Sequence, residues 1–239
     1  MAKTLREWVA TDVAAVKGKP FDWLSQYYFF RDPIRPYYID STHLFSPADG
    51  IIMYQKVIEP DECILEIKGK NYTLREAMQD SAYNKKSLVI GIFMTFYDVH
   101  INRMPSFGYL TYKHLDRIQS YNYPMLEIED DLVDQLMMSP NKAEYLFYNQ
   151  RVLNTIFAPA IKQNYHLIQF ADYGVNMIVP FSSRQRQPFF QNRRFSQIRY
   201  GSQVEFIIPI SELYEFELLQ TVGMHVEAGV DPLIKIAPK

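Results

Sequence analysis

The stretch Leu88-Val89-Ile90-Gly91-Ile92-Phe93-Met94 sets the expected fold. It is short, apolar and rich in β-branched residues, so it predicts a strand rather than a helix. Comparable runs, each bounded by Gly, Pro, Asp or Asn, occur on both sides of it in the chain and predict a β-rich body. These runs are residues 51–54, 63–67, 165–170, 175–179, 204–208 and 233–236.

Helical patterns are fewer. Apolar residues recur at spacings of three and four within the first 18 residues, which predicts an amphipathic helix ended by Gly18 and Pro20. Residues 127–155 look partly helical, with an acidic first turn, a stop at Pro140 and a further helical turn expected from Tyr145 to Leu153. We therefore expect an α+β, β-rich fold: a single compact domain of mostly antiparallel strands, with an N-terminal amphipathic helix and a few further helices.

Composition and motif content exclude several classes of function. The 25 basic residues of this 239-residue chain nearly balance its 27 acidic ones, so we expect no nucleic-acid partner. The single cysteine, Cys63, excludes an internal disulfide framework, and five scattered histidines lack metal-ligand spacing, so we predict no metal site. Phosphate-cradling GxxxxGK[ST] and GxGxxG loops and a GxSxG elbow are absent, which disfavours nucleotide enzymes and the commonest serine hydrolases.

The segment 1–30 combines the amphipathic helix with a run of aromatic residues, Tyr27-Tyr28-Phe29-Phe30, shortly after Trp23. Two interpretations stay open: a helix docked on its own domain, or a segment that rests in a lipid interface. No run approaches the roughly 18 consecutive apolar residues of a spanning helix, and no secretory signal is recognisable, so we expect neither a membrane span nor export by that route.

Three polar turns adjoin predicted strands. Residues 46–50, Ser-Pro-Ala-Asp-Gly, place Asp49 directly before a strand, and residues 98–105 hold His100 and Arg103 at the end of another. Strand ends are where rigid elements present catalytic groups. The third turn, within residues 199–209, has a Gly-Ser step that by itself predicts only a bulge or turn.

In this order, and with residues 29–35 ahead of them, the three segments closely resemble the phosphatidylserine decarboxylase family, in its shorter bacterial and archaeal type. Members typically show an FFRDP-x-R stretch, an SPADG turn, a DVH-x-NR-x-P segment followed by Gly, and an R-[FY]-GS strand; Gly108 supplies that Gly here. Residues 149–151, Asn-Gln-Arg, resemble the family's Asn-Glu-Arg element, and residues 222–229 resemble its closing V-G-x-x-V-x-A-G turn.

The resemblance implies a proenzyme that cleaves itself between Gly201 and Ser202. Ser202 Oγ would attack the Gly201 carbonyl, and β-elimination and hydrolysis would then leave a pyruvoyl group, the implied covalent cofactor. Glycine permits the close approach that a side chain would block. By the same resemblance, His100 would act as the base and Asp49 would orient it. Residues 1–30 would be a membrane-associating segment and 31–239 the decarboxylase domain, cleaved into 1–201 (beta chain) and 202–239 (alpha chain).

The implied activity is decarboxylation of phosphatidylserine to phosphatidylethanolamine and carbon dioxide. The pyruvoyl carbonyl derived from Ser202 would form a Schiff base with the serine amine of the headgroup and accept the electron pair that carbon dioxide leaves behind. His100 would supply the proton to the product. The implied partners are an anionic phospholipid and a membrane surface, the implied location is peripheral on the cytoplasmic face of the cell membrane, and a homo-oligomer is left open.

Two departures from the family pattern bear on the site. Arg103 stands where longer members carry a second histidine, assigned to maturation, and Gln203 follows the serine where Thr or Arg is usual. Residues 184–199 are rich in arginine and contain no acid. They form either a solvated loop or a site that grips an anionic headgroup, for which Arg103, Arg193, Arg194 and Arg199 are the candidate ligands.

Two alternatives stay open beside the decarboxylase of phosphatidylserine. A pyruvoyl enzyme could act on a soluble amino acid or on another serine-headed lipid; the aromatic segment favours a lipid. A non-catalytic module of the biotinyl or lipoyl kind also has a V-G-x-x-V-x-A-G tail, but it needs a lysine in a tight hairpin, and no matching turn occurs here.

Overall fold

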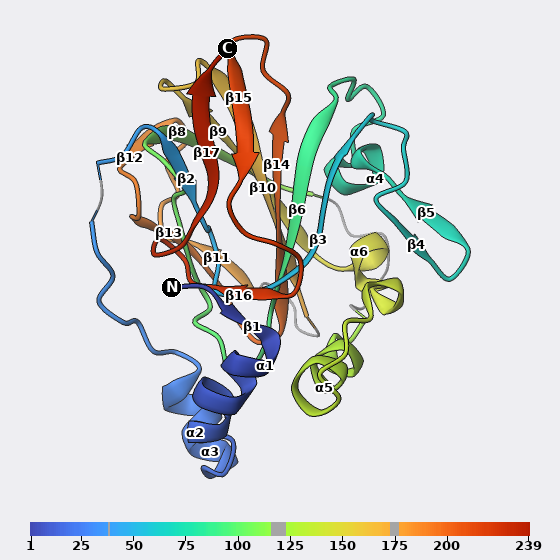
Figure 1. Cartoon of the computed structure of the whole chain (residues 1–239), viewed down its shortest axis with the longest axis vertical. Helices are drawn as coiled ribbons and strands as arrows, with labels where there is room; N and C mark the ends of the chain where they lie inside the picture. Colours follow the sequence, from blue (N-terminus) through green and yellow to red (C-terminus); the bar gives the residue numbers. More distant parts are fainter. Residues whose placement is uncertain (38, 116–122, 173–176) are drawn as a thin grey trace.

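A nine-stranded antiparallel sheet forms the centre of the molecule (Figure 1). The computed structural model describes residues 1–37, 39–115, 123–172 and 177–239. The order of the strands in the sheet is β1 (Lys3–Thr4), β16 (Met224–Val226), β3 (Gly50–Ile58), β6 (Ser87–Met94), β14 (Ser202–Pro209), β10 (Gln163–Ala171), β9 (Arg151–Ala158), β8 (Gly108–His114) and β12 (Gln187–Phe189).

The other strands form two small sheets and a hairpin. The sheets have the orders β11 (Ile178–Pro180), β13 (Arg194–Ile198), β7 (Ile101–Arg103) and β15 (Tyr214–Leu218), β17 (Pro232–Pro238), β2 (His43–Phe45), and the hairpin is β4 (Leu65–Ile67) with β5 (Lys70–Tyr72). The helices are α1 (Leu5–Trp8), α2 (Ala14–Val16), α3 (Phe21–Trp23), α4 (Leu74–Met78), α5 (Leu126–Asp134) and α6 (Tyr145–Tyr148), with π-helical turns at Val9–Val13 and Leu24–Tyr28 and a 3₁₀ turn at Pro140–Lys142.

The apolar run 88–94 lies in β6, next to β14 in the middle of the sheet. Every residue of β6 and of β14 is buried, because each strand has a neighbour on both sides and a covered face on either side. Ile90 and Ile92 point into one core and Val89 and Phe93 into the other. A strand that is buried on both faces needs no polar alternation, so the sequence shows a continuous apolar run. The predicted α+β, β-rich fold of mostly antiparallel strands is confirmed.

The two faces of the large sheet are covered differently. Helices α4, α5 and α6 and the β4–β5 hairpin lie over one face, where Leu74, Leu132 and Leu146 join the first core (Figure 1). The two small sheets lie over the opposite face, where Leu44 and Phe195 join the second core. The sheet thus separates two apolar layers, and a polar group on either side of β14 is enclosed by one of them.

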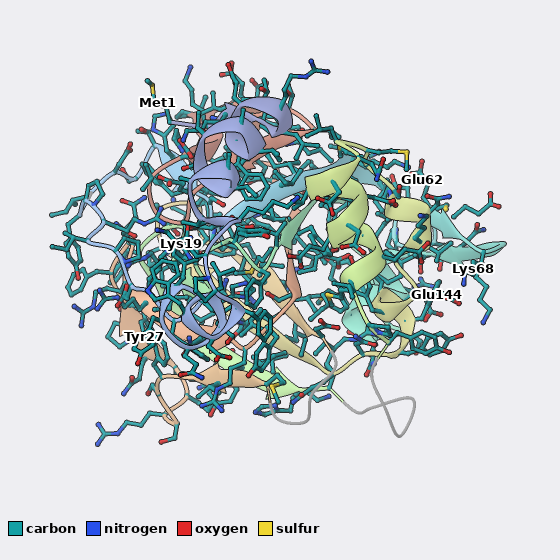
Figure 2. The ribbon with its side chains drawn as sticks, turned by 90° about the horizontal axis from the view of Figure 1, so that it is seen from below. Met1, Lys19, Tyr27, Glu62, Lys68 and Glu144 are labelled. Atoms are coloured by element: carbon teal, nitrogen blue, oxygen red, sulfur yellow. The ribbon has the colours of Figure 1, made fainter. Side chains whose placement is uncertain are left out.

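The N-terminal helices and α5 lie together at the end of the molecule where β14 begins (Figure 1). Figure 2 views this end, with Lys19 and Tyr27 marking the N-terminal segment beside the α5 helix. Lys17 and Asp134 form an ion pair between the two. Leu5, Trp8 and Val13 are buried against the body, whereas most aromatic side chains after Pro20 are exposed. The first helix therefore docks on its own domain, and four of the six aromatic side chains in residues 21–30 are exposed, whereas Phe29 is buried.

Several predicted boundaries differ from the structure. The first helix begins at Leu5 rather than at the N-terminus, because Lys3 and Thr4 pair with β16 and Thr4 then caps the helix in a capping box with Glu7. The helical turn expected from Tyr145 to Leu153 ends at Tyr148. The backbone at Asn149 is extended, and β9 starts at Arg151 because its alternating buried residues pair with β8 and β10.

Other strands are shorter than predicted or were not predicted. The strand expected at 63–67 begins at Leu65, and the one expected at 175–179 begins at Ile178, with Val175 outside the described residues. Ten strands were not predicted, because they are very short or mix polar and apolar residues, and most of them pair with distant parts of the chain. They are β1, β2, β5, β7, β8, β9, β12, β13, β15 and β16.

Gly91 should be required for the stability of this sheet. A Cβ added there would lie 2.2 Å from the ring of Tyr54, the residue that pairs with Gly91 on β3. Overpacking of this kind costs about 1–3 kcal/mol, so G91A should lower Tm by several degrees. Gly18 is the matched control, since a Cβ there meets nothing within 4 Å. Equal Tm values for G91A and G18A in thermal unfolding would contradict the packing argument.

Candidate active site

The Gly201-Ser202 step lies where the chain enters β14. Ser202 is fully buried and is paired with Met94 of β6 on one side and with Ala171 of β10 on the other. Its hydroxyl lies 3.0 Å from Nδ1 of His100 and 3.4 Å from the Met94 sulfur. Two of the residues expected at the site, Ser202 and His100, are therefore in direct contact, with Gly201 adjacent.

The other ring nitrogen fixes the tautomer of His100. Nε2 lies 2.8 Å from the backbone carbonyl of Thr95. A carbonyl oxygen can only accept, so Nε2 carries the proton and Nδ1 presents a lone pair to the Ser202 hydroxyl. Burial lowers the pKa of His100 to about 4, which leaves the ring neutral near pH 7. The imidazole is thus in the protonation state and orientation of a general base for Ser202.

A tight turn at the end of β6 holds the Thr95 carbonyl in place. One carboxylate oxygen of Asp98 accepts hydrogen bonds from the backbone and the hydroxyl of Thr95, both at 2.8 Å. The other lies 2.6 Å from Nε2 of His225. Burial favours neutral Asp98, but His225 and the Thr95 hydrogen bonds keep the pKa of this carboxyl below its usual value. Against the opposing effect of burial, Asp98 raises the pKa of His225.

Asp49 does not make the expected contact with His100. Its carboxylate accepts a hydrogen bond from Arg35 at 2.6 Å and one from the backbone N–H of Ala228 at 2.7 Å. Asp49 therefore connects the SPADG turn to Arg35 and to the C-terminal tail. The partner of the His100 ring is a backbone carbonyl instead.

The candidate arginine ligands gather around another carboxylate. Arg103 and Arg194 both form ion pairs with Asp32, at 3.0 and 2.8 Å, and the Arg103 side chain is almost fully buried. Arg193 donates to the Tyr37 hydroxyl, and Arg199 is exposed. Two of the four guanidinium groups thus already have an anionic partner within the chain, and the structure does not bring the four together on Ser202.

The unusual Gln203 fits a buried cage of tyrosines. Its amide accepts from the Tyr145 hydroxyl at 2.6 Å and donates to the Tyr54 hydroxyl at 2.7 Å. Two residues further along the strand, Glu205 accepts from Tyr54 and Tyr72. Burial raises the pKa of Glu205 to about 7. The residue after the serine therefore anchors β14 in the core and does not enter the site.

A cavity of about 630 Å³ opens beside Gly201, a volume typical of small-molecule sites. Its wall is mostly apolar and includes Phe21 and Leu24 of the N-terminal segment and Leu126 of α5. Glu129, also in the wall, accepts the backbone N–H of Phe96 at 2.9 Å. Burial raises the pKa of Glu129 to about 8, so this carboxyl is mainly neutral at pH 7.

The N-terminal segment and Arg31, which directly follows it, contact the site at three points. Phe29 stacks on the His100 ring with a centroid distance of 4.1 Å, and Trp8 stacks on His225 at 4.6 Å. Arg31 donates to the backbone carbonyls of Tyr97 and Asp98, at 2.6 and 3.3 Å. Phe29 therefore covers His100, and Arg31 holds the turn at residues 95–98 whose Thr95 carbonyl orients this ring.

Sequence reasoning missed Thr95, Glu129 and His225. Thr95 and Asp98 form a Thr-x-x-Asp pattern after a strand, which is a recognisable turn signal. Thr95 nevertheless acts on His100 through its carbonyl, a group common to all residues. Glu129 is one of several acidic residues at the start of a predicted helix, so nothing in the sequence sets it apart. His225 lies in the quoted tail motif, but its pairing with Asp98, 127 residues away, has no local signal.

Two observations concern other kinds of site. Across the ranges of the chain that the structure describes, no group of three or more His, Cys, Asp or Glu side chains is placed to hold a metal ion. Among those same residues, no helix has the length and apolar character needed to cross a bilayer.

Comparison with known proteins identifies the family. A phosphatidylserine decarboxylase proenzyme of Pelagibacter ubique is 29% identical over 210 residues, which cover 87% of this chain and 79% of the relative. A protein of Methanocaldococcus jannaschii with the provisional name archaetidylserine decarboxylase proenzyme is 27% identical over 204 residues (84% and 85%). A phosphatidylserine decarboxylase proenzyme of Chlorobium limicola is 25% identical over 202 residues (84% and 74%). The family model for phosphatidylserine decarboxylase matches residues 25–233, and the chain therefore belongs to this family of self-processing carboxy-lyases.

Proposed function

We propose that this protein decarboxylates phosphatidylserine to phosphatidylethanolamine with a pyruvoyl group that it makes from Ser202. The observation that carries the proposal is the 3.0 Å contact between Ser202 Oγ and the unprotonated Nδ1 of His100. A serine hydroxyl in contact with a base, on a residue preceded by glycine, is the arrangement that an N-to-O acyl shift requires.

The proposed maturation uses only residues of this chain and water. Ser202 Oγ gives its proton to His100 Nδ1 and attacks the Gly201 carbonyl carbon. The C–N bond breaks and the nitrogen of residue 202 takes the proton back, which leaves an ester. Loss of the α-proton of residue 202 then expels the Gly201 carboxylate and leaves dehydroalanine. Water replaces the nitrogen, which departs as ammonia, and a pyruvoyl group remains at the start of β14.

The site suits the group that would form there. The pyruvoyl carbonyl supplies an electron sink for the loss of carbon dioxide. Residue 202 would stay in contact with His100 Nδ1, which could then hold or deliver a proton at that point. The cavity beside Gly201 offers an apolar approach to the same point.

A lipid substrate fits the surroundings better than a soluble amino acid. The cavity wall is apolar, and the aromatic side chains of residues 21–30 continue this apolar surface outward, with Phe21 71% and Tyr27 68% exposed. We propose that residues 1–30 rest on a membrane surface and that residues 31–239 form the catalytic domain. The cytoplasmic face and any homo-oligomer remain predictions from the sequence.

A second serine-headed lipid has a specific observation in its favour. The relative from Methanocaldococcus jannaschii carries the name of an archaetidylserine decarboxylase proenzyme. The serine phosphodiester would be the feature common to both substrates, and the cavity would meet the hydrocarbon part. Assays with vesicles of phosphatidylserine and of archaetidylserine would distinguish the two.

Self-cleavage is the first prediction of this proposal. Mass spectrometry of the purified protein should show two chains, residues 1–201 and residues 202–239, the second beginning with pyruvoyl. S202A should remain one chain and should release no carbon dioxide from phosphatidylserine vesicles, because it lacks the attacking oxygen. An uncleaved wild-type chain with full activity would refute the proposal.

The second prediction concerns pH. Because burial lowers the pKa of His100 to about 4, the base form persists in mildly acidic solution. The nearby charges on this ring are Asp98, which raises its pKa, and Arg31, which lowers it. Precursor made by cell-free synthesis should therefore cleave at rates within about twofold between about pH 7.5 and 5.5, whereas an ordinary histidine would lose about tenfold. A tenfold loss over this range would contradict the prediction, and H100N should not cleave at any pH.

The third prediction tests the membrane surface. Replacing Phe21 and Tyr27 by serine removes two exposed rings and should weaken binding to phosphatidylserine vesicles by at least about tenfold. L213S is the matched control: Leu213 is 55% exposed and follows the far end of β14. Vesicle flotation measures both, and equal binding of the two variants would rule out a role for this surface.

A further inference from the structure

The carbonyl of Gly201 has a well-placed hydrogen-bond donor. The backbone N–H of Asp172 donates to the Gly201 oxygen with an N···O distance of 3.0 Å. Asp172 directly follows β10, and Ala171 at the end of that strand pairs with Ser202. The sheet itself therefore brings this N–H to the carbonyl that precedes Ser202.

The side chain of Asp172 also lies against Gly201. A Cβ added to Gly201 would lie 2.8 Å from a carboxylate oxygen of Asp172, so a side chain at position 201 would require this carboxylate to shift. Ser202 Oγ is held by His100, and the Gly201 oxygen by Asp172. The nucleophile and the carbonyl oxygen thus have separate partners.

The peptide group that carries this N–H is fixed at its other end. Its carbonyl, which belongs to Ala171, accepts a hydrogen bond from the side-chain amide of Asn149 at 2.8 Å. Asn149 is buried, and its side chain also bonds both backbone groups of Tyr123. A donor on the carbonyl of a peptide group polarises it and strengthens its N–H as a donor. Asn149, the first residue of the Asn-Gln-Arg element, therefore orients and polarises the 171–172 peptide.

We propose that the backbone N–H of Asp172 is the oxyanion donor for self-cleavage at Gly201-Ser202, and that Asn149 is its positioning residue. The inference rests on the self-cleavage proposed above. When Ser202 Oγ adds to the Gly201 carbon, negative charge develops on the Gly201 oxygen. A fixed donor at this distance stabilises that charge without reorganisation, and removal of one such donor typically costs about 10²–10³ in rate.

The decisive experiment removes the N–H alone. The α-hydroxy acid analogue of aspartate, introduced at position 172 by cell-free synthesis, replaces the N–H by an ester oxygen and keeps the side chain. Self-cleavage should slow by about 10²–10³. The matched control is the α-hydroxy analogue of phenylalanine at position 170, which pairs with Gln203 two residues along the same strand. It removes a sheet N–H but no contact with Gly201, so it should cleave at nearly the wild-type rate.

Three outcomes decide the matter. The inference would be overturned if the 172 ester cleaves at the wild-type rate. It would also be overturned if the 170 and 172 esters are slowed equally and lose protease resistance equally. In either case the hydrogen bond would be only one of the hydrogen bonds that hold the sheet together. Selective slowing of the 172 ester would support it. S202A, run alongside, tests the self-cleavage itself: cleavage of S202A at the same bond would refute the proposed function rather than the role of Asp172.

The role of Asn149 has its own test. N149A should slow cleavage of the otherwise native precursor, whereas N149A combined with the 172 ester should be little slower than the ester alone, because both act through one hydrogen bond. Additive effects of the two changes would show that Asn149 acts elsewhere, as a purely structural residue would. N149A without any effect would also overturn its positioning role.

Discussion

The hydrogen bond between Ser202 and His100 depends on how the whole sheet is assembled. Ser202 is held between Met94 and Ala171, so β14 must lie between β6 and β10 for its hydroxyl to reach the ring. His100 comes from the segment after β6 and is held by the backbone of Thr95 at the end of that same strand. The central strand β6 thus pairs with Ser202 and also positions the carbonyl that orients His100. A shift in the register between β6 and β14 would separate the serine from the histidine.

Buried polar pairs connect residues 1–201 with residues 202–239, the two parts of the chain on either side of the Gly201-Ser202 bond. His225 is paired with Asp98, and Glu205 accepts from Tyr54 and Tyr72. A buried charge is tolerated only with such partners, and removal of one partner is costly. Residues 202–239 are therefore fastened to residues 1–201 by these contacts and by two neighbouring strands of the sheet. Cleavage of the peptide bond before Ser202 would leave all of them in place.

The apolar run of β6 could be predicted from the residues themselves, because a strand that is buried on both faces requires apolar side chains. The roles of the Gly201-Ser202 step and of His100 were expected only from the resemblance to the family, and the structure places Ser202 Oγ and His100 Nδ1 3.0 Å apart. The expected contact between Asp49 and His100 is absent, since Arg35 takes the carboxylate and the Thr95 carbonyl takes the ring. Any residue type could supply the backbone carbonyl that orients His100, so the sequence does not identify it and only the structure shows which residue does so.

Arg103 shows what the missing second histidine means for the chemistry. Its guanidinium is bonded to Asp32 and to backbone carbonyls, so in the proposed self-cleavage the base role would fall on His100. A carbonyl partner orients this ring without adding the charge of a carboxylate, and burial holds its pKa at about 4. So weak a base gives little driving force for removing a hydroxyl proton. In the proposed self-cleavage, attack by Ser202 would then depend more on polarisation of the Gly201 carbonyl by its hydrogen-bond donor, the backbone N–H of Asp172.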